Sequence, residues 1–206
     1  MPVLFTQQIY ADTVLGVWNI TEQKPDLLKL IGDNWNEHSQ RVDHLHWLAS
    51  RAMVKDIFPK HEIEIVKDNF NKPHLKVDGR DFHISITHSG SFAAVFISET
   101  KNVGIDMEKI DQRIVKIKHK FMRDDKFDFI RPGEEAEIFT VIWAAKETMY
   151  KYYGKRELDF RKNLRIEPFV LSGDFELNGT IQKNNYFENL KIHVRKIEGY
   201  VLTFVC

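Results

Sequence analysis

A helical segment near residues 134–153 constrains the fold of this chain more than any other feature. Its apolar side chains recur at helical spacing and share one face: Ile138, Val141, Ile142, Ala145, Met149 and Tyr152. Pro132-Gly133 interrupts the pattern before the helix, acidic residues from Glu134 onward suit its first turn, and Gly154 suits its C-cap. We therefore expect a long helix that buries one face.

Most of the other segments have strand-like patterns and do not alternate regularly with helices. We expect strands over 3–10, 14–20, 63–66, 82–87, 92–97, 103–110, 164–171, 174–177, 190–197 and 200–205. Helical patterns cover residues 26–58, where a longer helix starts at about Asn36, and part of residues 111–130. A regular β-α-β alternation is missing, so the order favours an α+β fold over a doubly wound sheet.

Charge and cysteine content limit the classes of function and location. The 206 residues carry 30 basic and 30 acidic side chains, so no overall charge favours nucleic acid or an anionic membrane. Cys206 is the single cysteine, which fits a reducing compartment. The sequence shows neither a signal-peptide pattern nor an apolar run approaching ~18–20 residues. We expect a cytoplasmic protein without a membrane span.

Two carboxylates share one face of the expected strand 103–110. In Val103-Gly104-Ile105-Asp106-Met107-Glu108, alternation puts Gly104, Asp106 and Glu108 on the same face. The two acidic residues are then ~6.5–7 Å apart at Cα. Gly104 removes a side chain from that face and leaves room for a ligand or another backbone.

The long helix carries a second polar group away from its apolar face. At about 100° per residue, Glu147 lies opposite the apolar stripe, with Trp143, Lys146 and Lys151 to either side of it. A tryptophan outside the apolar stripe suggests that another lobe or a ligand covers this side of the helix. Each motif alone is more typical of a solvated helix face or a strand edge than of a functional site.

Together, the two motifs suit chemistry on a diphosphate. Carboxylate oxygens of Asp106, Glu108 and Glu147 are the ligands that Mg²⁺ or Mn²⁺ prefers. Ammonium groups of Lys146 and Lys151 would neutralise phosphate, while the metal would stabilise charge on the phosphoryl oxygens.

The same residues resemble the signature of the 4'-phosphopantetheinyl transferases. Val103 to Glu108 resembles the family's (V/I)-G-(V/I)-D-x-E, and Trp143 to Lys151 resembles its (F/W)-(S/C/T/A)-x-K-E-(A/S/T)-x-x-K. Upstream, Asn71-Lys72-Pro73 resembles the G-K-P element, and Ile86 to Gly90 resembles the I-S-H-S element. The length resembles the larger, surfactin-synthetase-activating (Sfp-type) class.

This resemblance implies an activity and residue roles. The family transfers phosphopantetheine from coenzyme A to a serine of an apo acyl or peptidyl carrier protein and releases adenosine 3',5'-bisphosphate. Asp106, Glu108 and Glu147 match its metal ligands, and Lys146 and Lys151 match lysines near the phosphates. Thr87, His88 and Lys72 match residues on the nucleotide side, and Trp143 matches a supporting position.

Departures from the family pattern leave the general base open. Asn71 and Thr87 replace a Gly and a Ser of the pattern. In the segment Phe121 to Phe127, Lys126 stands where the family often has a Glu. Asp125, Glu134, Glu135 and a metal-bound water are alternatives for the base.

Two basic regions have both a functional and a solvated interpretation. Arg41 and Arg51 lie on the N-terminal helical segment, where the family uses basic residues for the 3'-phosphate. The run Asp111 to Lys120 is either a solvated face or a surface for the acidic helix of a carrier protein.

We therefore expect a monomer of two similar α+β halves related by a pseudo-two-fold axis, as in the family fold. Residues 1–100 would form the nucleotide side, residues 101–206 would carry the metal and phosphate site, and the cleft between the halves would hold the reaction. The alternatives are a metal-dependent pyrophosphohydrolase and a non-catalytic module that binds coenzyme A.

Overall fold

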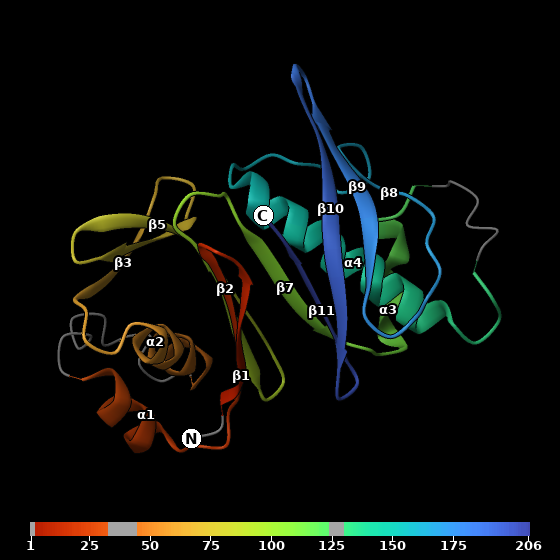
Figure 1. Ribbon diagram of the computed structural model, residues 1–206. Helices are drawn as coiled ribbons and strands as arrows, with labels where there is room; N and C mark the ends of the chain where they lie inside the picture. The colour runs from red at the N-terminus through yellow and green to blue at the C-terminus, as the bar shows by residue number, and fades with distance from the viewer. Residues whose placement is uncertain (1–2, 33–44, 124–129) are drawn as a thin grey trace. The chain divides into compact units, whose positions relative to one another are not determined.

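The computed structural model describes residues 3–32, 45–123 and 130–206 and shows an α+β protein (Figure 1). The chain divides into two compact units, Met1–Val103 and Gly104–Cys206, each with its own sheet and hydrophobic core. The α+β class predicted from the order of elements is confirmed. In the described residues, every helix is too short or too polar to cross a membrane.

The first unit is built on a six-stranded antiparallel sheet in the order β1-β2-β6-β5-β4-β3. Its elements are β1 (Val3–Tyr10), β2 (Thr13–Asn19), α1 (Lys24–Ile31), α2 (Leu45–Ile57), β3 (Ile63–Lys67), β4 (Pro73–Val77), β5 (Arg80–Ser89) and β6 (Phe92–Ser98). Strand β6 is central and buried at all of its residues, as its unbroken apolar pattern predicts.

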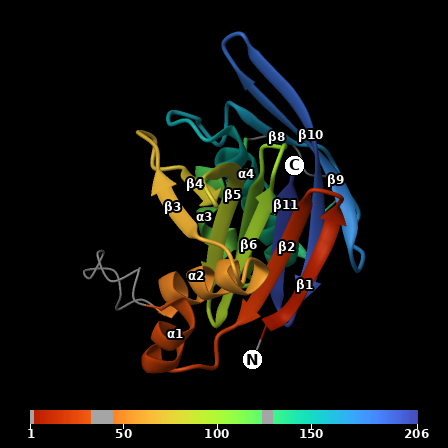
Figure 2. The ribbon, with the colours of Figure 1, turned by 60° about the vertical axis from the view of Figure 1, so that its left-hand side comes forward.

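Helix α2 packs on one face of this sheet (Figure 2). Leu48, Met53 and Val54 of the helix join strand residues such as Ile84 and Val95 in one buried cluster. Gly16 of β2 makes room for the helix, because a Cβ there would lie 2.6 Å from Sδ of Met53. The core of the first unit therefore lies between the sheet and α2.

Strand β4 was missed by the sequence patterns. It follows the turn around Asn71 and pairs with both β3 and β5. The turn into β5 uses Asp78 and Gly79, both with positive φ (50° and 76°), a conformation that Asp tolerates better than most residues and that Gly adopts without strain. An Asp-Gly turn between short apolar segments is a hairpin signal, so the sequence did contain this information.

The second unit is built on a five-stranded antiparallel sheet in the order β7-β11-β10-β9-β8. Its elements are β7 (Gly104–Lys109), α3 (Arg113–Ile117), the 3-10 turn η2 (Lys118–Lys120), α4 (Glu135–Tyr153), β8 (Leu164–Ile166), β9 (Phe175–Lys183), β10 (Tyr186–Ile197) and β11 (Tyr200–Val205). The expected strand 103–110 is thus an edge strand of this second sheet, paired with β11.

Helix α4 lies against one face of the second sheet and fills its core (Figure 1). The predicted apolar stripe is buried except for the half-buried Tyr152, and Val141 and Met149 are fully inaccessible to solvent. Gly154 ends the helix in the left-handed conformation (φ 71°), and its N–H donates to the carbonyl of Tyr150. The predicted helix and its C-cap are therefore confirmed.

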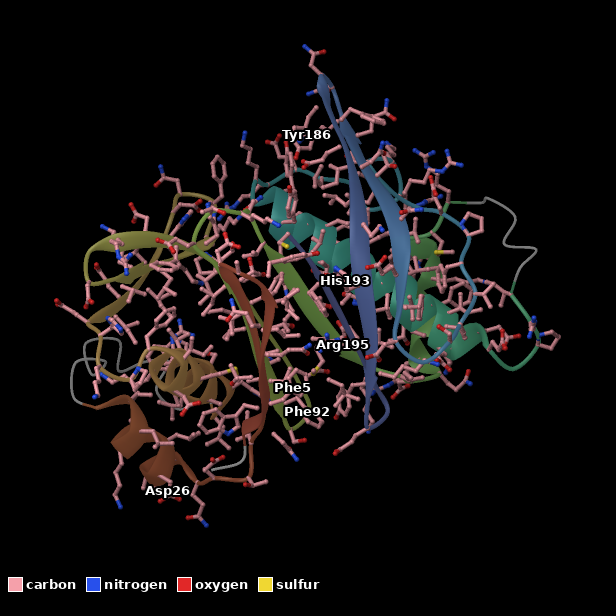
Figure 3. All side chains as sticks on the ribbon, in the orientation of Figure 1. Phe5, Asp26, Phe92, Tyr186, His193 and Arg195 are labelled. Atoms are coloured by element: carbon pink, nitrogen blue, oxygen red, sulfur yellow. The ribbon has the colours of Figure 1, made fainter. Side chains whose placement is uncertain are left out.

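The opposite face of the second sheet carries aromatic and basic side chains. His193 and Arg195 both come from β10 (Figure 3), and both lie over the ring of Phe204. Tyr186, near the tip of the β9–β10 hairpin, packs edge-on against Tyr153 of α4. The long hairpin is thereby tied to the C-terminal end of the helix.

Several predicted boundaries differ from the structure. Residues 164–171 form only the short strand β8, whereas β9 and β10 extend well beyond the predicted 174–177 and 190–197 because they continue into one long hairpin. Within the described part of residues 111–130, helix is confined to α3 and η2. The predicted helix start near Asn36 lies outside the described residues, and α2 confirms its later part.

Candidate active site

Gly104 allows the backbone of α4 to approach the strand that carries the acidic residues. A Cβ at Gly104 would lie 2.3 Å from the carbonyl oxygen of Thr148 and 2.9 Å from Cβ of Tyr152. The hydroxyl of Thr148 also donates to the Thr203 carbonyl of β11, at 3.1 Å. Of the two uses predicted for the space at Gly104, the structure therefore shows the second, a neighbouring backbone.

This close approach brings Lys151 of α4 to Asp106 of β7. The Lys151 Nζ donates to Asp106 Oδ1 at 2.7 Å, and Asp106 is only 5% exposed. A charge-assisted hydrogen bond to a buried carboxylate is strong because little water competes for it. One lysine and one acidic residue from the two sequence motifs are thus in direct contact.

The pKa values of Glu147 and Glu108 are both raised by this arrangement. Burial, followed by the negative charge of Asp106, raises the pKa of Glu147 to about 7, although Lys151 opposes the shift. The pKa of Glu108 is raised by the same two causes, opposed by a hydrogen bond from Trp143 and by Lys151. The three carboxylates therefore interact with one another, as the predicted convergence requires.

The carboxylates do not yet form a closed metal site. Across residues 3–32, 45–123 and 130–206, no three His, Cys, Asp or Glu side chains lie close enough together to hold a metal ion. Asp106 is instead bonded to Lys151, and Glu108 accepts from the Trp143 indole Nε1 at 2.8 Å. With all groups ionised, three carboxylates (−3) and one ammonium (+1) sum to −2. A divalent cation matches that charge, so the donor set fits Mg²⁺ or Mn²⁺ chemically.

Trp143 is covered by aromatic residues of its own unit. Its ring centroid lies 5.4 Å from that of Phe160, in a stacked arrangement, and 5.2 Å from that of Phe121. The covering group is therefore the pair of segments around Phe121 and Phe160, where the sequence suggested another lobe or a ligand.

Lys146 is buried and bonded to the backbone. Its residue exposure is 4%, and its Nζ donates to the carbonyl oxygens of Phe121 (2.7 Å) and Phe160 (2.8 Å). The contact with phosphate expected for Lys146 stays a prediction.

The nucleotide-side residues predicted from the resemblance all lie in the first unit. The Lys72 Nζ donates to Asn102 Oδ1 at 2.6 Å, and burial lowers the pKa of Lys72. Asn71, at the position of the family's glycine, has a φ of 68° and so adopts the left-handed conformation that glycine favours.

Thr87 and His88 lie at the end of β5. Thr87 is buried, whereas His88 is exposed and its ring stacks on that of His46, with centroids 4.5 Å apart. His46 is bonded through Nε2 to the carbonyl of Gly90, at 2.6 Å. The side chain of His88 is thus accessible but held in place by its neighbour.

The remaining predicted residues have mixed outcomes. Arg51 is buried, with its guanidinium 4.4 Å from the centroid of the Trp47 ring, so it is not a solvated charge. Arg41, Asp125 and Lys126 lie outside the described residues. Among the alternatives for the base, Glu135 accepts a hydrogen bond from the Gly133 N–H, and Glu134 is the N-cap residue of α4.

The basic run from Asp111 to Lys120 forms an amphipathic surface. Ile114, Val115 and Ile117 pack against the core of the second unit, while its basic side chains are exposed. Both the solvated and the carrier-binding interpretations fit this placement.

Sequence reasoning missed three residues around the site. Phe121, Phe160 and Arg123 contact α4 or the turn beside it. Phe121 and Arg123 were considered only as parts of the segment searched for the base, and Phe160 belongs to no recognisable motif. Phe160 did offer one signal, because a single aromatic residue in the charged segment Asp159 to Lys162 suggests that the ring packs against something.

Comparison with known proteins decides the family. The profile of the 4'-phosphopantetheinyl transferase superfamily matches residues 102–205, which is half of the chain. The chain belongs to the 4'-phosphopantetheinyl transferase superfamily. The matched segment includes Asp106, Glu108, Glu147 and Lys151, whereas Lys72, Thr87 and His88 lie outside it.

Individual members of the superfamily are similar over about half of this chain. The 4'-phosphopantetheinyl transferase gsp of Aneurinibacillus migulanus is 28% identical over 100 residues, which are 47% of this chain and 40% of the relative. A 4'-phosphopantetheinyl transferase of Bacillus subtilis is 28% identical over 89 residues (42% and 39%). The transferase AcpT of Escherichia coli K12 is 26% identical over 113 residues (52% and 57%). The matches thus span about half, or less, of each relative's length.

Proposed function

We propose that the protein transfers the 4'-phosphopantetheine group of coenzyme A to a serine of an apo acyl or peptidyl carrier protein. The observation that carries the proposal is the group formed by Asp106, Glu108, Glu147 and Lys151, all within the segment that matches the superfamily. Partly or fully buried carboxylates that repel one another beside an ammonium are typical of sites that bind a cation and a phosphate.

The three carboxylates would hold Mg²⁺ or Mn²⁺. A bound divalent ion supplies positive charge for the pyrophosphate oxygens of coenzyme A and for the charge that develops on them. The bound ion would replace the Lys151 ammonium as the positive charge next to Asp106. Lys151 would then be available to donate to the phosphate oxygens.

Burial and the neighbouring carboxylates raise the pKa of Glu147 to about 7 in the metal-free protein, so binding of a divalent ion near neutral pH would release a proton from this group. In the proposed reaction the serine oxygen bonds to the β-phosphorus, and its proton passes to a base outside the three metal ligands, for which Asp125, Glu134, Glu135 and a water molecule stay open. The bond from the β-phosphorus to the bridging oxygen breaks, and adenosine 3',5'-bisphosphate leaves.

The other predicted residues complete the proposal. Lys72, Thr87 and His88 of the first unit would bind the nucleotide part of coenzyme A, and the exposed basic side chains of residues 111–120 would attract an acidic carrier protein. We also propose that the protein acts as a monomer. We further propose a cytoplasmic location, since the single cysteine fits a reducing compartment.

Intact-mass analysis of a carrier protein tests the proposal. The protein is incubated with Mg²⁺, coenzyme A and several apo carrier proteins, and we expect a mass gain of one phosphopantetheine group. Asp106→Asn should abolish the gain, whereas Lys191→Met, which removes an exposed ion pair with Glu176, should not. Consumption of coenzyme A without carrier modification would establish a pyrophosphohydrolase instead, and binding of coenzyme A without turnover would establish a binding module.

A further inference from the structure

A stripe of three residues on α4 holds the segment around Phe160. Trp143, Lys146 and Tyr150 are spaced i, i+3 and i+7, so they line one side of the helix. The ring of Phe160 lies between the two aromatic residues, with centroids 5.4 Å from Trp143 and 5.6 Å from Tyr150. Lys146, midway along the stripe, binds the carbonyl of the same Phe160.

The buried charge of Lys146 requires these carbonyls. Removing an ammonium from water costs several kcal/mol unless strong hydrogen bonds replace the lost hydration. Two carbonyl oxygens, at 2.7 and 2.8 Å, supply such bonds and come from two segments that are far apart in sequence. Lys146 therefore fastens both segments, at Phe121 and at Phe160, to α4.

The turn that contains Phe160 is shaped to present its carbonyls to cations. Asp159 accepts hydrogen bonds from the N–H groups of Arg161 and Lys162, at 2.8 and 2.9 Å. The carbonyls of these two residues accept from the guanidinium of Arg123, at 2.5 and 2.6 Å. Three successive carbonyls, 160 to 162, thus bind two cationic side chains, one buried and one exposed.

The two fastened segments also hold the indole of Trp143. Phe121 and Phe160 each contact its ring, and the indole N–H donates to Glu108 Oε1 at 2.8 Å. A planar ring confined by two others keeps its N–H in one direction. The orientation of the Glu108 carboxylate therefore depends on where Phe121 and Phe160 lie, and so on Lys146.

We propose that Lys146 is a positioning residue that sets the orientation of Glu108 through Phe121, Phe160 and Trp143. The inference rests on the proposed function, in which Glu108 is a metal ligand, and it replaces the phosphate contact expected for Lys146. Partners that orient a metal ligand typically change metal affinity 10–100-fold when they are removed. The same size of effect is expected here.

Binding of Mn²⁺, followed by the loss of the free-ion electron paramagnetic resonance signal, tests the proposal without turnover. Lys146→Met and Trp143→Phe should each weaken Mn²⁺ binding by about tenfold. Arg123→Met, which loosens the same turn from its exposed side, should weaken it about two- to threefold. Lys191→Met serves as the control and should bind Mn²⁺ like the wild type.

A double-mutant cycle distinguishes positioning from independent roles. Because Lys146 acts through Trp143, the double variant should bind Mn²⁺ about as weakly as either single variant. Lys146→Met should also shift the fluorescence emission of Trp143. The emission of Trp143 is the difference between proteins with and without Trp143→Phe, and it is compared between the wild-type and the Lys146→Met backgrounds. If Lys146→Met does not fold, the cycle of Arg123→Met with Trp143→Phe tests the same route.

Unchanged Mn²⁺ affinity in Lys146→Met and Arg123→Met, with only a raised KM for coenzyme A, would overturn the proposal and restore a phosphate contact. Effects that multiply in the double variant would also overturn it. Failure of the proposed function looks different. In that case wild-type protein modifies no carrier, while the cycle and the emission shift still report whether Lys146 positions Trp143.

Discussion

The two units solve the same packing problem in different ways. Each packs a helix on one face of an antiparallel sheet, and each uses a strand glycine at the contact. In the first unit, Gly16 makes room for the flexible end of the Met53 side chain. In the second, Gly104 makes room for the backbone of α4 itself, at the carbonyl of Thr148.

This difference separates a core from a functional site. A methionine side chain can adjust when its neighbours change, so the contact at Gly16 leaves the position of α2 loosely specified. A backbone contact cannot adjust in that way, and the one at Gly104 fixes α4 beside Asp106. The second unit can therefore hold Lys151 and Glu147 near the strand carboxylates. The contact is so close that it does not tolerate a side chain at position 104.

The largest expected effect comes from substituting alanine for the two contact glycines, Gly104 and Gly16. Gly104→Ala should destabilise the protein by about 3 kcal/mol or more, because its Cβ would overlap a helix backbone, and should abolish transfer. Gly16→Ala should cost about 1 kcal/mol, since the Met53 side chain can move. Urea unfolding and the carrier assay measure both. Equal effects of the two substitutions would contradict the distinction.

Glu147→Gln should separate function from stability. It should abolish transfer yet stabilise the metal-free protein by about 1–2 kcal/mol above pH 7, after allowance for partial exposure of the side chain. The folded carboxyl has a pKa of about 7, against 4.5 ordinarily, so between these values it keeps a proton that the unfolded chain has released. The free energy of unfolding therefore falls as pH rises from 4.5 to 7, and Glu147→Gln removes this loss.

Thermal unfolding across this pH range provides the measurement. The gain from Glu147→Gln should be small near pH 4.5 and largest at pH 8. Mg²⁺ should raise the melting temperature of the wild type and have much less effect on the variant. A variant less stable than the wild type at pH 8 would show that Glu147 carries no electrostatic strain.

A substitution in the first unit should affect binding of coenzyme A more than the rate. Lys72→Met should raise the KM for coenzyme A about tenfold, with a smaller change in kcat, if Lys72 contacts the nucleotide. Burial lowers the pKa of Lys72, so in the wild type this KM should rise as pH increases through the lowered value. Steady-state kinetics at several pH values would show a flat profile in the variant. A fall in kcat with an unchanged KM would contradict a binding role.

The smallest effect concerns the backbone before Lys72. Asn71 has a φ of 68°, where a side chain without Asn's local hydrogen bonding costs about 1 kcal/mol. Asn71→Ala should therefore lower the melting temperature by several degrees, whereas Asn71→Gly should change it little. Equal losses in both variants would show that the Asn side chain matters here and the conformation does not.

Much of the fold was predictable where periodicity and turn residues agree. The helix 135–153 has an apolar stripe, acidic residues at its start and Gly154 at its end, and all three were read correctly. The hairpin β5–β6 was equally clear. Strand β4 was missed because it is short and begins with Pro73, and the ends of β9 and β10 because their polar residues hide the alternation.

The sequence placed the candidate site residues on their strand and helix but did not predict all of their contacts. Spacing placed Asp106 and Glu108 on one strand face, and the helical wheel placed Glu147 and Lys151 together. The helical wheel could not show that the Lys146 ammonium donates to backbone carbonyls, because the tertiary fold brings the carbonyls of Phe121 and Phe160 to this side of α4. Local patterns carry no information about such distant partners.

The most direct test of the account is the titration of the Glu147 carboxyl by carbon-13 nuclear magnetic resonance, assigned with Glu147→Gln. Asp106, Glu108 and Glu147 form a partly buried site whose negative charge is only partly neutralised by Lys151. We therefore expect a pKa of about 7 for Glu147 in the metal-free protein and a marked fall of this pKa on addition of Mg²⁺. A pKa near 4.5, or one that Mg²⁺ leaves unchanged, would contradict it.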